Sequence, residues 1–199
     1  ALLLGMARRI KEELQVPIVC SLQDEDILID GLPESYRQNV WEIISQISVE
    51  VDAFIAVSNY YRDFMCNRLE LSTDKVHVVY NGINLEGHEP VSSLPEPPVI
   101  GYLERQCRDK GLHTLSEAFV ILKKRNRLNE LKLKIAGGKT ADDELFIKEV
   151  HQRFDQQGIS DDVEFLPNLS REDKLNFLQS LSVMSVPAEH REAFGVYIL

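Results

Sequence analysis

Three cations stand close together in an otherwise acidic chain. Arg105, Arg108 and Lys110 fall within one short loop, whereas the 199-residue sequence carries 32 acidic and 22 basic residues and a formal charge of −10. The loop follows the apolar run 98–103, which is typical of a strand and has Gly101 at its expected end, where a ligand can approach the backbone. Cations at such a place can neutralise the charge of a phosphate. The sequence therefore predicts an anion-binding loop.

A carboxylate followed by a glycine stands near the end of the sequence. Glu192 precedes Ala193, Phe194 and Gly195, and the run 182–186 before it is short and β-branched, as in a buried strand. A helix beginning near Gly195 would direct free backbone N–H groups toward this loop, and such helix starts bind anions. We therefore predict an anion site with Glu192 beside it. The simpler alternative is an acidic residue that the helix dipole favours.

Both segments resemble parts of one enzyme family. The sequence from Glu192 to Gly195 is similar to the first half of the motif of the group 1 (family 4-type) retaining glycosyltransferases, which use nucleotide sugars and whose second glutamate would fall at position 200. Arg105 and Lys110 match the spacing of the family's donor loop, although the family usually has glycine where Glu104 stands. The resemblance identifies the chain as a fragment of such an enzyme.

Further segments extend the resemblance, in order, along nearly the whole chain. Residues 53–64 and 75–84 are similar to the last two strands of the family's N-terminal domain, and residues 134–138 and 163–168 continue the match. The resemblance implies an α/β fold of the GT-B type, with two Rossmann-like half-domains. The alternation of strand and helix patterns also predicts parallel sheets with helices on both faces.

A proline-rich segment without hydrophobic periodicity predicts the domain boundary. Residues 86–98 hold four prolines and two serines without hydrophobic periodicity, and we predict that they form a Pro-rich linker. Residues 1–85 are then the C-terminal part of the acceptor-side Rossmann-like domain. Residues 99–199 are the donor domain, truncated at its C-terminus.

The resemblance implies that a sugar passes from a nucleotide-diphosphate donor to an acceptor hydroxyl with retention, as in a hexosyltransferase. Negative charge builds on the departing diphosphate, and its stabilisation is the largest catalytic task. The predicted catalytic residues are Arg105 and Lys110, which stabilise that charge without a metal ion, and Glu192, which orients the sugar hydroxyls. Because ligands lie outside the carboxyl ends of parallel strands, the loops of the second half are expected to line one crevice. The predicted donor-binding residues are Gly101, Arg105, Lys110, Gly137, Asn168, Glu192, Ala193, Phe194 and Gly195.

Several of these residues have a simpler interpretation. Arg105 and Lys110 could be solvated surface cations, and Gly137 and Asn168 could be turn residues. On the acceptor side, Gln23 stands where the family often has histidine; glutamine can hydrogen-bond a sugar but cannot act as a base. Either the acceptor is handled differently, or the first half is not a working acceptor half.

Composition disfavours other classes of protein. The charge of −10 disfavours a nucleic-acid surface, and no run approaches the roughly 18 apolar residues of a membrane span. Three separated cysteines, without Cys-x-x-Cys spacing, indicate a reducing compartment and no zinc site. We expect a cytoplasmic protein, with peripheral membrane association left open, and no cofactor or metal. Its expected partners are a nucleotide sugar and a sugar, lipid or small-molecule acceptor.

Two other functions compete with this one. A non-catalytic nucleotide-sugar-binding or scaffolding module could have the same fold, and the glutamine at position 23 gives that idea some support. A nucleotide-binding oxidoreductase is disfavoured because no Gly-x-Gly-x-x-Gly follows an early strand. We expect the 199-residue fragment of the glycosyltransferase to be inactive by itself.

Overall fold

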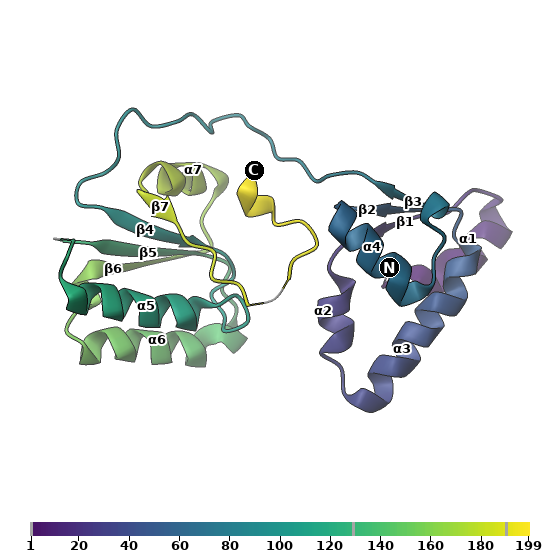
Figure 1. Ribbon diagram of the computed structural model, residues 1–199, viewed down its shortest axis with the longest axis horizontal. Helices are drawn as coiled ribbons and strands as arrows, with labels where there is room; N and C mark the ends of the chain where they lie inside the picture. Colours follow the sequence, from purple (N-terminus) through teal and green to yellow (C-terminus); the bar gives the residue numbers. More distant parts are fainter. Residues whose placement is uncertain (1, 129, 190) are drawn as a thin grey trace. The chain divides into compact units, whose positions relative to one another are not determined.

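The computed structural model describes residues 2–128, 130–189 and 191–199. It divides into two compact units (Figure 1). The first unit comprises Ala1–Asn84 together with Glu192–Leu199, and the second comprises Leu85–Arg191. Each unit contains its own parallel sheet, so each is described by itself.

The first unit is built on a three-stranded parallel sheet in the order β1-β2-β3. The strands are β1 (Val19–Leu22), β2 (Ala53–Ala56) and β3 (Val76–Val78), and the helices are α1 (Ala7–Leu14), α2 (Glu25–Asp30), α3 (Glu34–Ile47) and α4 (Asn59–Leu69). Their apolar faces meet in one core: Trp41 of α3 and Met65 of α4 are buried together with Phe54 of β2. The hydrophobic spacing of Trp41, Ile44 and Ile47 along α3 produces this packing.

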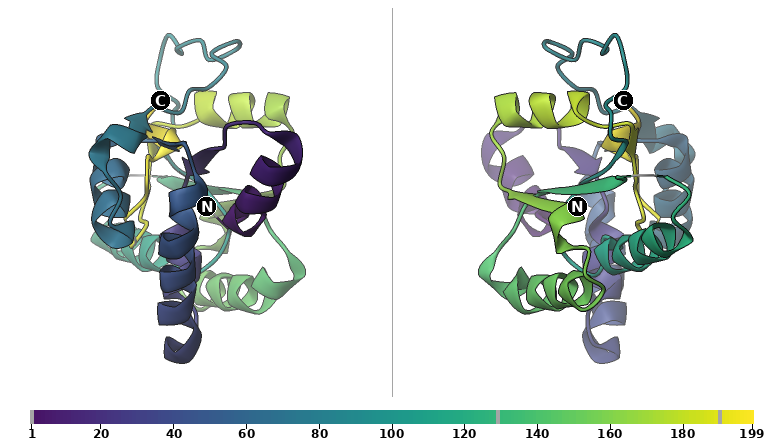
Figure 2. Two further views of the ribbon diagram at one scale, coloured as in Figure 1. Left: turned by 90° about the vertical axis from the view of Figure 1, so that its right-hand side faces the viewer. Right: turned by 90° about the vertical axis from the view of Figure 1, so that its left-hand side faces the viewer.

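The second unit is built on a four-stranded parallel sheet in the order β6-β5-β4-β7. The strands are β4 (Val99–Leu103), β5 (Lys132–Gly137), β6 (Val163–Pro167) and β7 (Val183–Met184), and the helices are α5 (Leu112–Arg125), α6 (Glu144–Gln156) and α7 (Arg171–Gln179). Helices α5 and α6 cover one face of this sheet and α7 covers the other (Figures 1 and 2).

Alternation along the strands explains why both faces of the second sheet are covered. Tyr102 and Ile135 are fully buried in a core with Phe119 of α5. Val99 and Ala136 point to the opposite face of the sheet, where they belong to a separate core with Phe177 of α7. Because both faces of the sheet are covered, its strand β4 carries an almost continuous hydrophobic run, as in other α/β sheets.

Most elements lie where the sequence predicts them, with differences at their ends. Helix α2 was not predicted, because residues 25–30 are too short for a clear helical period. The expected strand 182–186 contains only two residues of regular strand. The spacings Thr140-x-x-Asp143 and Ser170-x-x-Asp173 predict helix N-caps, and both are present: Thr140 forms a capping box with Asp143, and the Ser170 side chain accepts a hydrogen bond from the Asp173 backbone. The pattern of residues 1–14 predicts a helix, and α1 spans Ala7–Leu14, while residue 1 lies outside the described residues.

The boundary between the units is close to the one predicted, but the last segment differs. The chain divides after Asn84, and residues 86–98, expected as a linker, group with the second unit. They contain no helix or strand, and the Glu86 carbonyl accepts a hydrogen bond from Arg171 of α7 at 2.7 Å. Residues Glu192–Leu199, expected in the donor domain, group with the first unit.

Candidate functional site

The loop from Glu104 to Gly111 lies at the topological switch point of the second sheet. The chain leaves β4 toward β5 and β6 on one side and later returns as β7 on its other side. Ligands of open α/β sheets bind where the strand order reverses, outside the carboxyl ends of the strands. The loop after β4 therefore stands where this architecture places a ligand.

Arg105 is held by a buried carboxylate. Its guanidinium donates two hydrogen bonds to Asp143, from Nε at 3.2 Å and from Nη2 at 3.0 Å, while the arginine side chain is 52% exposed and that of Asp143 only 5%. The same carboxylate accepts from the backbone and the hydroxyl of Thr140. The Arg105 guanidinium holds the pKa of the Asp143 carboxyl below its usual range, with help from the Thr140 backbone N–H. Arg105 is thus oriented by a fixed anion and still reaches solvent.

Lys110 and the loop backbone are fixed by separate contacts. The Lys110 ammonium lies 2.9 Å from Oε2 of Glu104. The buried Tyr102 hydroxyl donates to the Arg105 carbonyl at 2.7 Å and lies 3.4 Å from the Lys110 carbonyl. Burial raises the pKa of Tyr102, so it remains a neutral donor. One phenol therefore holds together the two backbone positions that carry the predicted catalytic cations.

Gly137 and Asn168 belong to the same edge of the sheet, where they join the neighbouring loops. Gly137 has φ +127°, and a Cβ there would lie 1.9 Å from the Glu104 carbonyl oxygen. Asn168 donates its backbone N–H to the Gly137 carbonyl at 2.9 Å, and its side chain accepts from the Lys139 backbone at 3.1 Å. These contacts give both residues a structural role, and contact with a donor stays a prediction.

Gly101 does not stand at a strand end as expected. It is the third residue of β4, and a Cβ at this position would lie 2.2 Å from Cδ1 of Leu181. A larger residue here would clash with Leu181, which follows α7, so packing accounts for the glycine. The expected position of Gly101 at the end of the strand was wrong, because β4 continues to Leu103, and its contact with a donor stays a prediction.

The segment of Glu192 to Gly195 packs on the first unit. The Ala193 backbone N–H donates to Oδ1 of Asp24 at 2.6 Å, and its carbonyl accepts from the Ser58 hydroxyl at 2.5 Å. The Phe194 ring lies 6.1 Å from that of Tyr80 and packs against the first core. The expected helix after Gly195 is a single 3-10 turn, Val196–Ile198, in the part that the structure describes.

Gln23 lies in the exposed loop directly after β1. Its side-chain amide donates to the Ser21 hydroxyl at 3.0 Å, and its backbone N–H donates to Glu25 at 2.8 Å. It lines a cavity of about 550 Å³ whose other walls are mainly apolar, among them Leu3 and Leu28. Its contact with an acceptor stays a prediction.

The predicted residues thus fall into two groups. Gly101, Arg105, Lys110, Gly137 and Asn168 meet around the carboxyl ends of β4, β5 and β6 in the second unit, whereas Glu192, Ala193, Phe194, Gly195 and Gln23 belong to the first unit. Among the described residues, no group of three or more His, Cys, Asp or Glu side chains could hold a metal ion. No helix in that part of the chain is long and apolar enough to cross a membrane.

Sequence reasoning missed several residues that fix these loops. Oε1 of Glu189, in the loop after β7, lies 3.0 Å from both His113 Nε2 and the Thr114 hydroxyl at the start of α5. A Cβ on Gly111 would lie 1.9 Å from the Pro187 carbonyl oxygen, so the loops after β4 and β7 touch. The Lys-Gly pair is the sequence signal for this approach, since its glycine has φ +74°.

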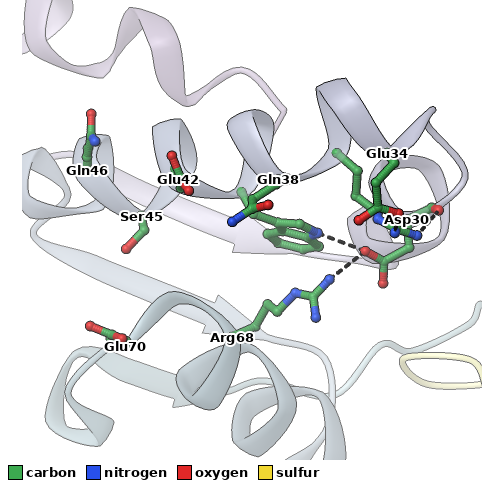
Figure 3. A pocket seen from close by; sticks show the side chains of 10 residues that line it. Asp30, Glu34, Gln38, Glu42, Ser45, Gln46, Arg68 and Glu70 are labelled. Atoms are coloured by element: carbon green, nitrogen blue, oxygen red, sulfur yellow. Dashed lines mark hydrogen bonds and ion pairs between the residues drawn. The ribbon is translucent and has the colours of Figure 1, made fainter.

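A cavity of about 760 Å³ lies in the first unit between α3 and the end of α4, and it contains none of the predicted residues. Figure 3 shows its polar wall, where Asp30 accepts from Trp41 Nε1 at 2.8 Å and from Arg68 Nη2 at 2.6 Å. The Arg68 guanidinium also lies 4.6 Å from the centre of the Trp41 ring. These groups satisfy one another, so the cavity is a solvated surface of the unit.

Several solved structures superpose on nearly the whole of this chain. Anabaena HepE in complex with UDP superposes with a TM-score of 0.80 at 19% identity, over 98% of this chain and 53% of HepE. Sucrose-phosphate synthase of Thermosynechococcus elongatus superposes with a TM-score of 0.74 at 18% identity, over 98% of this chain and 50% of the synthase. A glycosyltransferase of Rickettsia africae superposes with a TM-score of 0.71 at 18% identity, over 98% of this chain and 58% of that enzyme. The chain has the GT-B fold and spans about half the length of these structures. No curated protein matches it.

Family models match both halves of the sequence. Residues 1–86 match the model of Glycosyltransferase Family 4. Residues 86–199 match the model of the Glycosyl transferases group 1, which is the half that contains Arg105, Lys110 and Glu192. The chain therefore belongs to the group 1 glycosyltransferase family.

Proposed function

We propose that the protein containing this chain transfers a sugar from a nucleoside-diphosphate donor to an acceptor hydroxyl. Family membership supports the reaction class. The observation that carries the proposal is the loop after β4, where two cations stand at the switch point with their backbone fixed by Tyr102. HepE was solved with UDP and with UDP-glucose, which supports a donor of that chemical class.

Arg105 and Lys110 are proposed to bind the diphosphate. Each now faces one carboxylate, Asp143 or Glu104, and a diphosphate would present more negative charge to the same groups. Arg105 keeps half of its side chain exposed and can bind a phosphate oxygen while Asp143 still holds its other edge. The carboxylates then act as a rigid support that fixes the direction of each cation before the donor arrives.

The proposed transfer moves one bond at the anomeric carbon. The bond from that carbon to the β-phosphate oxygen breaks, its electron pair remains on the departing nucleoside diphosphate, and the acceptor oxygen forms the new bond. The acceptor proton passes to the diphosphate. Two cations can offset the charge that develops, so we propose a reaction without a divalent metal and with retention of configuration. Glu192 is proposed to orient the sugar hydroxyls.

A transfer assay with the protein containing this chain tests the proposal. UDP-glucose and GDP-mannose are supplied with a panel of glycosides and lipid acceptors, and the anomeric configuration of the product is read by NMR. Transfer with retention that persists in a chelator is the expected result, and Glu192→Gln should abolish it. Binding of the donor without transfer or donor hydrolysis would indicate a binding module instead, and an inverted product would contradict retention.

A further inference from the structure

The peptide groups on both sides of Ala193 are held by the first unit. Oδ1 of Asp24 accepts the Ala193 N–H at 2.6 Å, and the Ser58 hydroxyl donates to the Ala193 carbonyl at 2.5 Å. Ala193 itself is only 3% exposed and belongs to the first hydrophobic core. We call these two hydrogen bonds the Ala193 clamp.

The clamp is built from three successive loops of one sheet. Asp24 follows β1, Ser58 follows β2, and Tyr80, whose ring contacts Phe194, follows β3. Since the three strands are parallel, their carboxyl ends lie at one edge of the sheet. A segment more than 130 residues away in sequence from Ser58 is thus received where this type of sheet places its functional loops.

The clamping side chains are themselves fixed. Ser58 is the N-cap of α4 and accepts the Tyr61 backbone N–H at 3.0 Å, so its hydroxyl hydrogen is directed to Ala193. Asp24 has φ +58°, a backbone conformation that aspartate, asparagine and glycine tolerate better than other residues. The Ser58 hydroxyl is therefore directed at the incoming segment, and Asp24 reaches it from a backbone conformation that few residue types adopt.

We propose that Asp24 and Ser58 are positioning residues that fix the direction of the Glu192 side chain. The N–H that Asp24 holds belongs to the peptide group joining Glu192 to Ala193, so the clamp restricts the backbone rotation that aims Glu192. The inference rests on the proposed function, in which Glu192 orients the sugar of the donor. The diphosphate is bound in that proposal by Arg105 and Lys110, which the clamp does not touch. Loss of the clamp should therefore weaken recognition of the sugar and spare that of the diphosphate.

The clamp is tested first without any ligand. In the protein containing this chain, the Ala193 amide should exchange slowly with deuterium, and Asp24→Gly should speed its exchange at least tenfold. Glycine tolerates the left-handed backbone, so this variant removes the carboxylate alone. Asp24→Asn keeps an acceptor oxygen and should restore protection. Asp63→Ala removes an exposed carboxylate of α4 and serves as the matched control.

Binding then separates positioning from folding. By calorimetry, Asp24→Gly should weaken UDP-glucose binding at least tenfold and leave UDP binding within about twofold, with rescue by Asp24→Asn. Ser58→Ala should show the same split even if it melts earlier, because it also removes the α4 cap. Equal losses for both ligands, or no loss for either, would overturn the positioning role. If the unaltered protein binds neither ligand, the proposed function fails and the positioning role with it, while Ala193 exchange still reports whether the clamp exists.

Discussion

At the scale of single residues, the loop after β4 combines cations with carboxylates that orient them. Arg105 meets Asp143 through two hydrogen bonds, and Lys110 meets Glu104. The partly exposed pair of Lys110 and Glu104 adds little to stability, whereas the pair of Arg105 and the buried Asp143 carboxylate also stabilises the fold. Oriented cations bind phosphate with charge-assisted hydrogen bonds, so both residues should contribute to ligand binding.

We predict that Arg105→Ala and Lys110→Ala each weaken binding of UDP by roughly tenfold to a hundredfold, the scale of one lost charge-assisted hydrogen bond. Calorimetry measures the affinity, and thermal melting should change little for Lys110→Ala, whereas Arg105→Ala should melt earlier because the buried Asp143 carboxylate loses its partner. Arg108→Ala removes a cation of the same loop whose partner is the exposed Glu149, and it should leave UDP affinity nearly unchanged. Normal binding with much earlier melting would show that Arg105 and Lys110 are structural.

The Asp143 carboxyl should give the second unit a dependence on acid. Because its pKa is lowered in the folded state, its contribution to stability is present above the ordinary aspartate value of about 4 and is lost as pH falls through the lower folded value. We predict that Asp143→Asn melts below the unaltered chain at pH 7 and that the difference shrinks at pH 3. A difference that is equal at both pH values would contradict the ion pair with Arg105.

Only part of this residue-scale arrangement was predictable. The spacing of Thr140 and Asp143 predicts a helix cap, and the structure confirms it. That the same carboxylate also holds Arg105, 38 residues earlier, depends on which strands are neighbours and leaves no local signal. The clamp on Ala193 was missed for the same reason, because Asp24 is 169 residues away.

At the scale of elements, a glycine joins the loops after β4 and β5. Gly137 has φ +127° and lies against the Glu104 carbonyl, whereas a Cβ on Gly138 would meet nothing within 4 Å. A side chain at position 137 would therefore clash with the backbone, whereas one at position 138 would point into open space.

We predict that Gly137→Ala destabilises the chain by about 2–4 kcal/mol, since it adds backbone strain to a clash with a main-chain atom. Gly138→Ala is the matched control and should change the free energy of unfolding by less than about 0.5 kcal/mol. Chemical denaturation measures both. If the two variants unfold alike, the loop is not fixed by this contact.

Strand β1 is an edge of the first sheet, and its Val19 side chain is 57% exposed beside the apolar cavity that Gln23 lines. An unpaired apolar edge is a template for pairing. We predict that the isolated 199-residue chain associates as its concentration rises and that Val19→Lys reduces this association. Sedimentation velocity at several concentrations measures it, and a monomer throughout the range would contradict the prediction.

The elements themselves followed the sequence closely where a pattern was long. The apolar run 99–103 is β4 as predicted, and the period of Leu112, Leu115 and Phe119 predicts α5. Gly101 was expected at the end of the strand. An apolar run does not show which of its positions packs against another segment, here Leu181 after α7. The helix expected near Gly195 stays a prediction, because only the 3-10 turn Val196–Ile198 falls within the given sequence.

At the scale of the whole molecule, the order of the segments was predictable and their grouping was not. Two Rossmann-like units follow from alternating strands and helices, and the group 1 family from blocks in a fixed order. That Glu192–Leu199 joins the first unit depends on tertiary packing of Ala193 and Phe194, which a short apolar segment does not specify.

The central claim is that this chain carries a nucleoside-diphosphate site that needs no metal ion. Its most direct test is calorimetry of UDP and GDP binding to the 199-residue chain, with and without a chelator, followed by a transfer assay on the same sample. We predict binding of at least one nucleotide with equal affinity in both buffers, and no sugar transfer by this chain alone. Binding that the chelator abolishes, or no binding of either nucleotide, would contradict the account.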